Sequence, residues 1–235
     1  MSTHPLVLLP GTLCDERVWN AVRSHLPSSM EIICPGYKRG NTMSDVVANM
    51  RDELPDKFAL AGFSLGGLAA LELVNQAPES VTGLALISSH AGVDTFESKK
   101  QRLQQLEKVR EKGFESIIED LLIRAGLISA SLSFDTNTSL IMNMAKDLEF
   151  GDFERQVHMA ITRSDQHQTL SNMVNPTLIL ASQNDQMCLP SKPILAAKAN
   201  KNARLVWIQD GGHYLPLEQP QQVAKELINW MEDQA

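Results

Sequence analysis

The feature that most constrains the fold is an apolar run that leads into a glycine-rich turn, at residues 57–71. The run predicts a buried strand, the turn Gly-Phe-Ser-Leu-Gly has Ser64 at its centre, and the small and apolar residues that follow predict a helix. Gly62 and Gly66 have no Cβ, so the strand and the helix can approach each other closely beside Ser64. The first amides of the helix then point toward any negative charge that forms near the Ser64 hydroxyl.

Other glycine-rich turns fit this stretch less well. A phosphate-binding loop needs Lys followed by Ser or Thr after its glycines, whereas Leu68 and Ala69 stand there. A dinucleotide-binding turn needs the spacing G-x-G-x-x-G and an acidic residue at the end of the next strand. Here the spacing is G-x-x-x-G-G, and the next apolar run ends with Ser and His at residues 88–90. A turn with a purely structural role remains an alternative.

Apolar runs that read as strands alternate with segments of helical periodicity along the chain. Besides the run before Ser64, such runs stand at residues 6–9, 31–34, 81–88, 176–181 and 204–208. This alternation predicts an α/β protein with a doubly wound, mostly parallel sheet of about six strands. Between residues 94 and 172 the strand patterns give way to apolar residues at helical spacing. We therefore expect a core formed by residues 1–93 and 173–235, with a helical cap inserted at 94–172.

Three residues with catalytic chemistry follow predicted strands, in the chain order Ser64, Asp185, His213. Active sites of open α/β sheets form at the carboxyl ends of the strands, so we expect the three side chains to converge. A neutral serine hydroxyl is a weak nucleophile and needs a base, which in turn needs an anchor. We predict that His213 takes the Ser64 proton and later protonates the leaving group, while Asp185 holds the imidazole and stabilises its cation.

Other acids and histidines are weaker candidates for these roles. Asp165 lies in the predicted cap, and Asp210 is expected to point along its own strand although it adjoins His213. His158 and His167 lie in or near the predicted cap, where no strand anchors them. The chain has no H-E-x-x-H motif and no paired cysteines, so we predict no metal site and no cofactor.

Three loops carry a family resemblance. The turn at 62–66, the Asn-Asp-Gln-Met-Cys-Leu-Pro loop at 184–190 and the Gly-Gly-His-Tyr-Leu-Pro-Leu-Glu-Gln-Pro loop at 211–220 resemble those of the α/β-hydrolase superfamily, in particular its small capped serine esterases. The order nucleophile, acid, histidine is also that of this superfamily. The resemblance covers nearly the whole chain and implies the α/β-hydrolase fold, with the cap over the site.

The resemblance also implies an oxyanion hole made of backbone N–H groups. In this superfamily the first of these strands ends in a His-Gly-x loop, and here Pro-Gly-Thr stands at residues 10–12. By position, the donors would be the amides of Leu65 and Thr12, with Leu13 as the neighbouring alternative. A simple strand-end turn is the other interpretation of residues 10–12.

Leu13, His90 and Met144 are the candidate substrate-binding residues. His90 follows a predicted strand and could face the catalytic cavity, although a polar strand end is the more ordinary interpretation. Met144 belongs to an apolar stripe of the predicted cap and would line an adaptable acyl pocket, or else fill the core of the cap.

The activity implied by the resemblance is ester hydrolysis through an acyl-enzyme, on small or medium acyl esters. The same triad serves thioesterases, perhydrolases, C–C hydrolases and the lyase of menaquinone synthesis, and fold and triad do not choose among them. A function of another class also stays open, namely a non-catalytic receptor that binds a small ligand in the triad pocket.

Composition limits the partners and the compartment. The formal net charge of −7 argues against nucleic acid and anionic membrane surfaces as partners. Three cysteines without paired spacing fit free thiols in a reducing compartment. The N-terminus lacks a basic start followed by a long apolar core, and no apolar segment reaches membrane-spanning length. We therefore expect a cytoplasmic protein, as a monomer or a homodimer.

Overall fold

The computed structural model describes residues 4–125 and 134–232 and contains a six-stranded parallel sheet. The strand order is β2-β1-β3-β4-β5-β6, and every neighbouring pair runs parallel. The strands are β1 (Leu6–Leu9), β2 (Ile32–Ile33), β3 (Phe58–Phe63), β4 (Val81–Ile87), β5 (Thr177–Ala181) and β6 (Ala203–Trp207). The predicted α/β fold with about six strands is confirmed.

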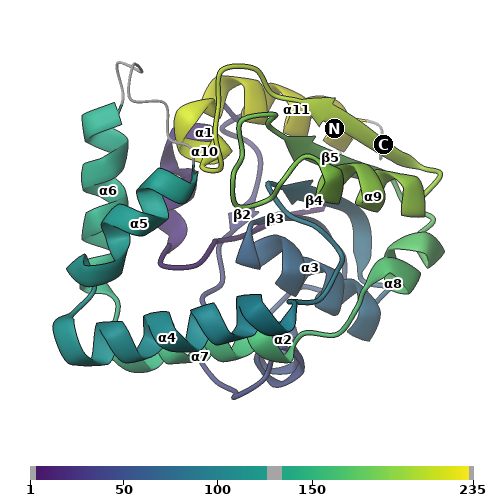
Figure 1. The fold of residues 1–235 in the computed structure, drawn as a ribbon. Helices are drawn as coiled ribbons and strands as arrows, with labels where there is room; N and C mark the ends of the chain where they lie inside the picture. Colours follow the sequence, from purple (N-terminus) through teal and green to yellow (C-terminus); the bar gives the residue numbers. More distant parts are fainter. Residues whose placement is uncertain (1–3, 126–133, 233–235) are drawn as a thin grey trace.

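Helices cover both faces of the sheet, which explains why its central strands are continuous apolar runs (Figure 1). Side chains of Leu6 and Leu8 point into one core layer and those of Val7 and Leu9 into the other, because successive strand residues face opposite sides. The helices that pack on the first face are η1 (Glu16–Trp19), α1 (Asn20–Arg23) and α11 (Pro220–Glu232). Those on the second face are α2 (Met43–Arg51), α3 (Leu65–Gln76) and α9 (Ser191–Ala199). The sheet is therefore doubly wound, as predicted.

The chain between β4 and β5 is helical. Its helices are α4 (Phe96–Lys112), α5 (Glu115–Ala125), α6 (Phe134–Asp147), α7 (Phe150–Thr162) and α8 (His167–Asn172). Helices α4 to α7 lie together at one end of the sheet, with α4 and α7 side by side (Figure 1). They share an apolar cluster that includes Leu106, Ile118 and Phe153. We call α4 to α7 the inserted helices.

The inserted helices also contact the rest of the molecule. Helix α7 packs against α2, and Ile141 and Met144 of α6 join the core layer on the first face of the sheet. Helix α8 packs against α3 and α9. The division into a core and a cap at residues 94 and 172 stays a prediction. Among the described helices, which include the short α10 (Leu215–Glu218), none has the length and apolar character that crossing a membrane requires.

Candidate active site

Ser64 occupies a sharp turn between β3 and α3. Its backbone has φ 53° and ψ −113°, a left-handed conformation that is rare for residues with a side chain. A Cβ on Gly62 would overlap the Gly66 carbonyl, and a Cβ on Gly66 would overlap the Leu9 carbonyl. The hydroxyl of Ser89 donates a hydrogen bond to the Ser64 carbonyl at 2.8 Å, which supports the turn from the end of the next strand. The glycines thus allow the close approach that exposes the Ser64 hydroxyl.

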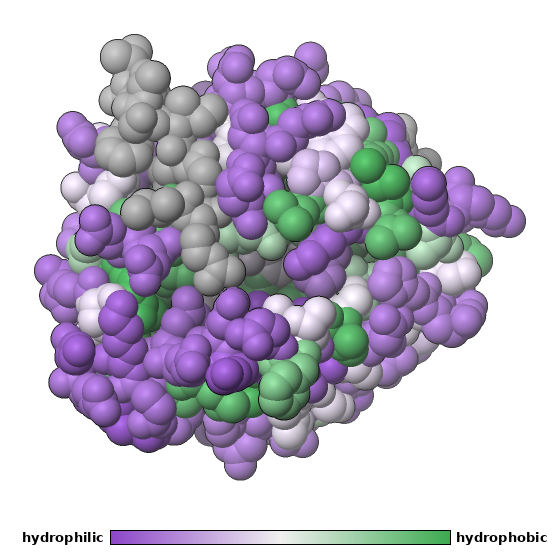
Figure 2. Space-filling model, viewed as in Figure 1, coloured by the Kyte–Doolittle hydropathy of each residue, from purple (hydrophilic) through white to green (hydrophobic). Residues whose placement is uncertain are grey.

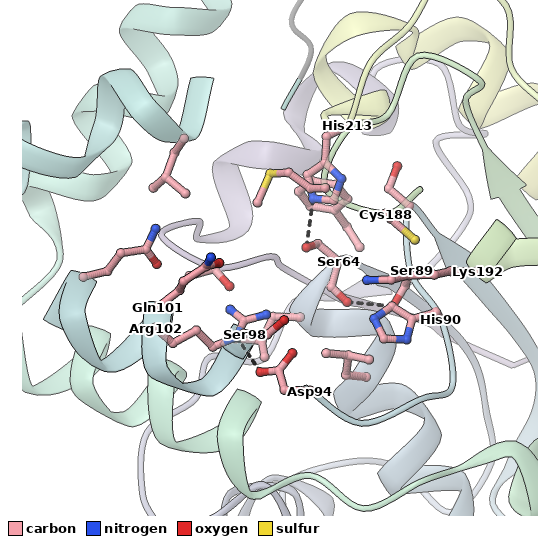
Figure 3. Close-up of a pocket in the computed structure, with 18 of the residues that line it drawn as sticks. Ser64, Ser89, His90, Asp94, Ser98, Gln101, Arg102, Cys188, Lys192 and His213 are labelled. Carbon is pink, nitrogen blue, oxygen red and sulfur yellow. Dashed lines mark hydrogen bonds and ion pairs between the residues drawn. The ribbon is translucent and has the colours of Figure 1, made fainter. Parts of the chain in front are cut away.

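The structure brings the three predicted side chains together (Figure 3). His213 Nε2 lies 3.0 Å from Ser64 Oγ, and His213 Nδ1 lies 2.8 Å from Asp185 Oδ2. Asp185 and His213 are buried, with 1% and 3% of their surfaces exposed. The three residues follow β3, β5 and β6, whose carboxyl ends share one edge of the parallel sheet.

The carboxylate of Asp185 is held in a fixed orientation. Its Oδ1 accepts hydrogen bonds from the amides of Met187 and Cys188, both at 2.8 Å, and this leaves Oδ2 for His213. The ring of His213 packs against Phe63, with their centroids 5.3 Å apart. These contacts leave the imidazole few alternative orientations.

Two further polar residues fix the loop that carries His213. Glu218 accepts hydrogen bonds from the amides of Gly212 and Tyr214 at 3.0 and 2.9 Å, on either side of the histidine. Ser182, at the end of β5, donates a hydrogen bond to the carbonyl of Gly211. Ser182 therefore connects the loop of the acid to the loop of the histidine.

Thr12 and Leu65 line the same cavity as Ser64. The backbone amide of neither residue donates to an acceptor within residues 4–125 and 134–232. The neighbouring amide of Leu13 differs, because it donates to Oε1 of the buried Gln156 on α7 at 2.8 Å. The amides of Thr12 and Leu65 are thus free to donate to a ligand, whereas the amide of Leu13 already donates to Gln156.

The cavity above Ser64 has a volume of about 140 Å³ and two kinds of wall. One wall is apolar and is formed by Leu68, Ile117, Leu121, Phe153 and Met187. The other is polar and includes Asp94, Ser98, Gln101, Arg102 and Lys192 (Figure 3). On the face of the molecule shown in Figure 2, hydrophobic side chains gather across the middle, and hydrophilic side chains surround them.

His90 lines this cavity. Its Nδ1 accepts a hydrogen bond from the amide of Gly92 at 3.1 Å. Burial, followed by the nearby charges of Lys192 and Arg163, lowers the pKa of His90 to about 3. The imidazole is therefore neutral around pH 7.

The other two candidate substrate-binding residues are not among those that line the cavity. The side chain of Leu13 is buried in the apolar cluster of the inserted helices, and Met144 is buried in the core layer on the first face of the sheet. An apolar side chain on a periodic stripe fits a core as well as a cavity wall, and here both side chains pack into apolar clusters. Their assignment as substrate-binding residues is wrong for this cavity.

Several residues at the site were not predicted. Gln156 had a visible sign in the sequence, because a polar residue three positions after Phe153 and one before Val157 interrupts the apolar stripe of a helix. Arg102 and Lys192 had no such sign, since charged residues on helices are usually solvent-exposed.

In the described part of the chain, no three His, Cys, Asp or Glu side chains form a group that could hold a metal ion.

Comparisons with known proteins agree with this architecture. A model of the alpha/beta hydrolase family matches residues 6–226. A pimeloyl-[acyl-carrier protein] methyl ester esterase of Legionella pneumophila is 39% identical over 90 residues, which are 36% of this chain and only 38% of that protein. The bifunctional biotin biosynthesis protein BioHC of Cellvibrio japonicus is 22% identical over an alignment that covers 99% of this chain and 48% of that protein.

Solved structures extend the comparison to the whole chain. A thermophilic esterase of Thermogutta terrifontis, solved with malate bound, has a TM-score of 0.85 and 25% sequence identity, and the match covers 99% of this chain and 91% of the esterase. An enol-lactonase of Burkholderia xenovorans has a TM-score of 0.84 at 16% identity, over 98% of this chain and 92% of the lactonase, and this shows a common fold alone. With a family model that matches nearly its entire length, this chain belongs to the alpha/beta hydrolase family.

Proposed function

We propose that the protein is a serine hydrolase that cleaves esters of small or medium acyl groups through an acyl-enzyme. The observation that carries this proposal is the chain of contacts from Ser64 Oγ to His213 Nε2 at 3.0 Å and from His213 Nδ1 to Asp185 Oδ2 at 2.8 Å. This chain ends at a hydroxyl on a strained turn that opens into a cavity. A buried base with a fixed carboxylate partner is what a serine nucleophile requires.

The proposed reaction has two halves. In the first, His213 takes the Ser64 proton as Oγ attacks the ester carbonyl, and the same imidazole then protonates the departing alcohol. In the second, His213 takes a proton from water, the resulting hydroxide attacks the acyl-enzyme, and Ser64 recovers its proton as the acid leaves. Asp185 stabilises the imidazolium that forms in both halves.

The oxyanion of each tetrahedral intermediate would accept hydrogen bonds from the amides of Thr12 and Leu65. Both amides lack a protein acceptor in the described residues, whereas that of Leu13 is taken by Gln156. This difference favours Thr12 over Leu13 as the second donor. Loss of one such donor typically costs about 3 kcal/mol of transition-state stabilisation, so the position of this loop matters as much as the triad.

The names of the relatives and the cavity size support ester substrates of modest length. The curated relatives quoted above include a methyl ester esterase, and the structure with 25% identity is that of an esterase. The cavity of about 140 Å³ is close to the ~150 Å³ that holds a benzene molecule in an engineered protein cavity. It therefore suits an acyl group of about six carbon atoms.

The test is hydrolysis of p-nitrophenyl acetate, butyrate and octanoate by the wild type and by Ser64→Ala. We expect a burst of nitrophenol in the wild type and a loss of at least about 10⁴-fold in kcat for Ser64→Ala. The matched control is Ser171→Ala, an exposed serine on α8, which should keep full activity. Equal turnover by wild type and Ser64→Ala would refute the proposal. Ligand binding without turnover would favour the receptor, and turnover of a diketone or enol-pyruvyl substrate alone would favour the C–C hydrolase or the lyase.

The compartment and the assembly are also proposals. The three cysteines, Cys14, Cys34 and Cys188, are free thiols, which supports a reducing compartment such as the cytoplasm. We keep the expectation of a monomer or homodimer, which size-exclusion chromatography with light scattering would test.

A further inference from the structure

Two cations from different elements line the cavity. Arg102 extends from α4, in the inserted helices, and Lys192 extends from α9, on the sheet side. In Figure 3 they approach the space next to Ser64 from opposite sides, Lys192 beside His90 and Ser89 and Arg102 beside Asp94. A ligand bound to Ser64 would therefore lie between two positive charges.

Negative charge on this wall does not balance these cations. Asp94 is a single carboxylate shared by two guanidinium groups, with Arg102 Nε at 2.7 Å and Arg163 Nη2 at 2.8 Å. The backbone amide of Lys192 donates to the Leu189 carbonyl, whereas its ammonium has no ion-pair or hydrogen-bond partner within residues 4–125 and 134–232. Of the further acids nearby, Asp165 pairs with His167, and Glu72 lines a separate small pocket and accepts hydrogen bonds from Gln76 and Gln166.

The low pKa of His90 has burial as its main cause, and the surrounding charges lower it further. The positive charges of Lys192, Arg163 and Arg102 oppose its protonation, while that of Asp94 favours it. A neutral His90 adds no charge of its own, so the positive potential comes from the lysine and the arginines.

We propose that Lys192 binds a carboxylate of the substrate, while Arg102 adds positive charge from the opposite side of the cavity, so that the natural ester carries a free acid group in addition to the bond that is cleaved. This inference rests on the proposed esterase function and names its substrate class. A half-ester of a short dicarboxylic acid meets the requirements, because its ester reaches Ser64, its methylene chain packs on the apolar wall, and its carboxylate receives charge-assisted hydrogen bonds.

One carboxylate suits the unpaired charge of Lys192, and the cavity volume suits about six carbons, so monomethyl adipate is the probe. We would measure kcat/KM for monomethyl adipate and for the uncharged dimethyl adipate at low salt. The wild type should prefer the half-ester about tenfold, as expected for one hydrogen bond to a charged group. High salt should reduce this preference.

Variants of two lysines on the same helix test the role of Lys192. Lys192→Gln should bring the ratio of half-ester to diester close to one, and Lys192→Glu should invert the preference in favour of methyl 6-aminohexanoate, which carries a positive charge. Lys198→Gln is the matched control, because Lys198 is an exposed residue at the other end of α9, and it should keep the wild-type ratio.

The outcomes separate this inference from the proposed function. If the wild type hydrolyses both esters equally well, or if Lys192→Gln and Lys198→Gln have the same ratio, the carboxylate site is refuted and the esterase stands. If neither ester is hydrolysed, the esterase is refuted for these substrates. In that case calorimetry would measure the binding of monomethyl adipate to Ser64→Ala and to the double variant that also carries Lys192→Gln. Binding that Lys192→Gln weakens about tenfold would support the carboxylate site. Binding that is absent, or unchanged by Lys192→Gln, would refute this site.

Discussion

The loops at the carboxyl edge of the sheet and the inserted helices form the same cavity in different ways. Hydrogen bonds fix the loops: Ser89 donates to the Ser64 carbonyl, and the amides of Met187 and Cys188 donate to Asp185. The amides on either side of His213 donate to Glu218. The inserted helices contribute side chains such as Phe153 and Arg102, which are positioned by packing between helices and by ion pairs. We infer that the sheet edge supplies the proposed chemistry and that the inserted helices, together with Lys192 on α9, shape the choice of substrate.

The two regions should therefore respond differently to substitution. Changes at the sheet edge should lower kcat, because they remove interactions made in the transition state. Changes in the inserted helices should alter stability, substrate ratios or the position of the loops beneath them. We expect the effects of substitution to decrease in the order Asp185, Asp94, Gln156 and His90.

The largest effect is expected for Asp185→Asn. The amide keeps the shape of the carboxylate but cannot stabilise the imidazolium, so kcat should fall about 10⁴-fold. Steady-state kinetics with a p-nitrophenyl ester measures this loss of kcat. The control is Asp165→Asn, the acid that lies between the inserted helices and α8 and pairs with His167, for which we expect wild-type kcat. A comparable loss in both variants would remove the contrast between the two regions.

Asp94→Asn should mainly change stability. The side chains of Asp94 and Arg163 are 6% and 4% exposed, and the neutral amide would leave a buried guanidinium without its partner. The free energy of unfolding, from urea denaturation, should fall by about 3–5 kcal/mol. The exposed pair of Lys108 and Asp120 provides the comparison, since Asp120→Asn should cost less than about 1 kcal/mol. Similar costs for the two variants would contradict the assignment of Asp94 as a structural anchor.

Gln156→Ala should lower kcat about tenfold while KM stays within about twofold. We expect Gln156 to act as a positioning residue, because its Oε1 accepts a hydrogen bond from the Leu13 amide, next to the Thr12 amide that we propose as an oxyanion donor. The expected effect is smaller than the 10²–10³-fold loss of a donor itself, since the donor remains present. The control is Gln168→Ala, an exposed glutamine on α8. A rise in KM with unchanged kcat would instead assign Gln156 to substrate binding.

The smallest effect concerns pH and His90. Burial and the nearby cations lower the pKa of this residue in the folded state to about 3, so below pH 6.5 the unfolded state binds the proton and the folded state does not. Stability should therefore fall as the pH decreases, by roughly 1 kcal/mol between pH 6.5 and 5.5. His90→Gln should remove this part of the pH dependence, while the exposed His25→Gln should keep it. Equal slopes for both variants would contradict a neutral buried His90.

The fold and the meeting of the three catalytic candidates were predictable from local patterns in the chain. Apolar runs and helical periodicity depend on residues close together in the chain, and they predicted the parallel sheet with helices on both faces. The glycines around Ser64 predicted the sharp turn, since only residues without a Cβ allow that approach. The positions of Asp185 and His213 after strands predicted that both would meet Ser64, because parallel strands end at one edge.

The identity of the residues that line the cavity depends on tertiary packing. Gln156 and Leu13 are 143 residues apart in the sequence, and Arg163 and Asp94 are 69 apart. No local sequence pattern therefore predicts either contact. Packing also took Met144 and the side chain of Leu13 into apolar clusters, since an apolar residue at helical spacing fits a core and a cavity wall equally well. Chemistry at a strand end is a local property that the chain order reveals, whereas the charge of a cavity is a sum over distant elements and exists only after they have packed together.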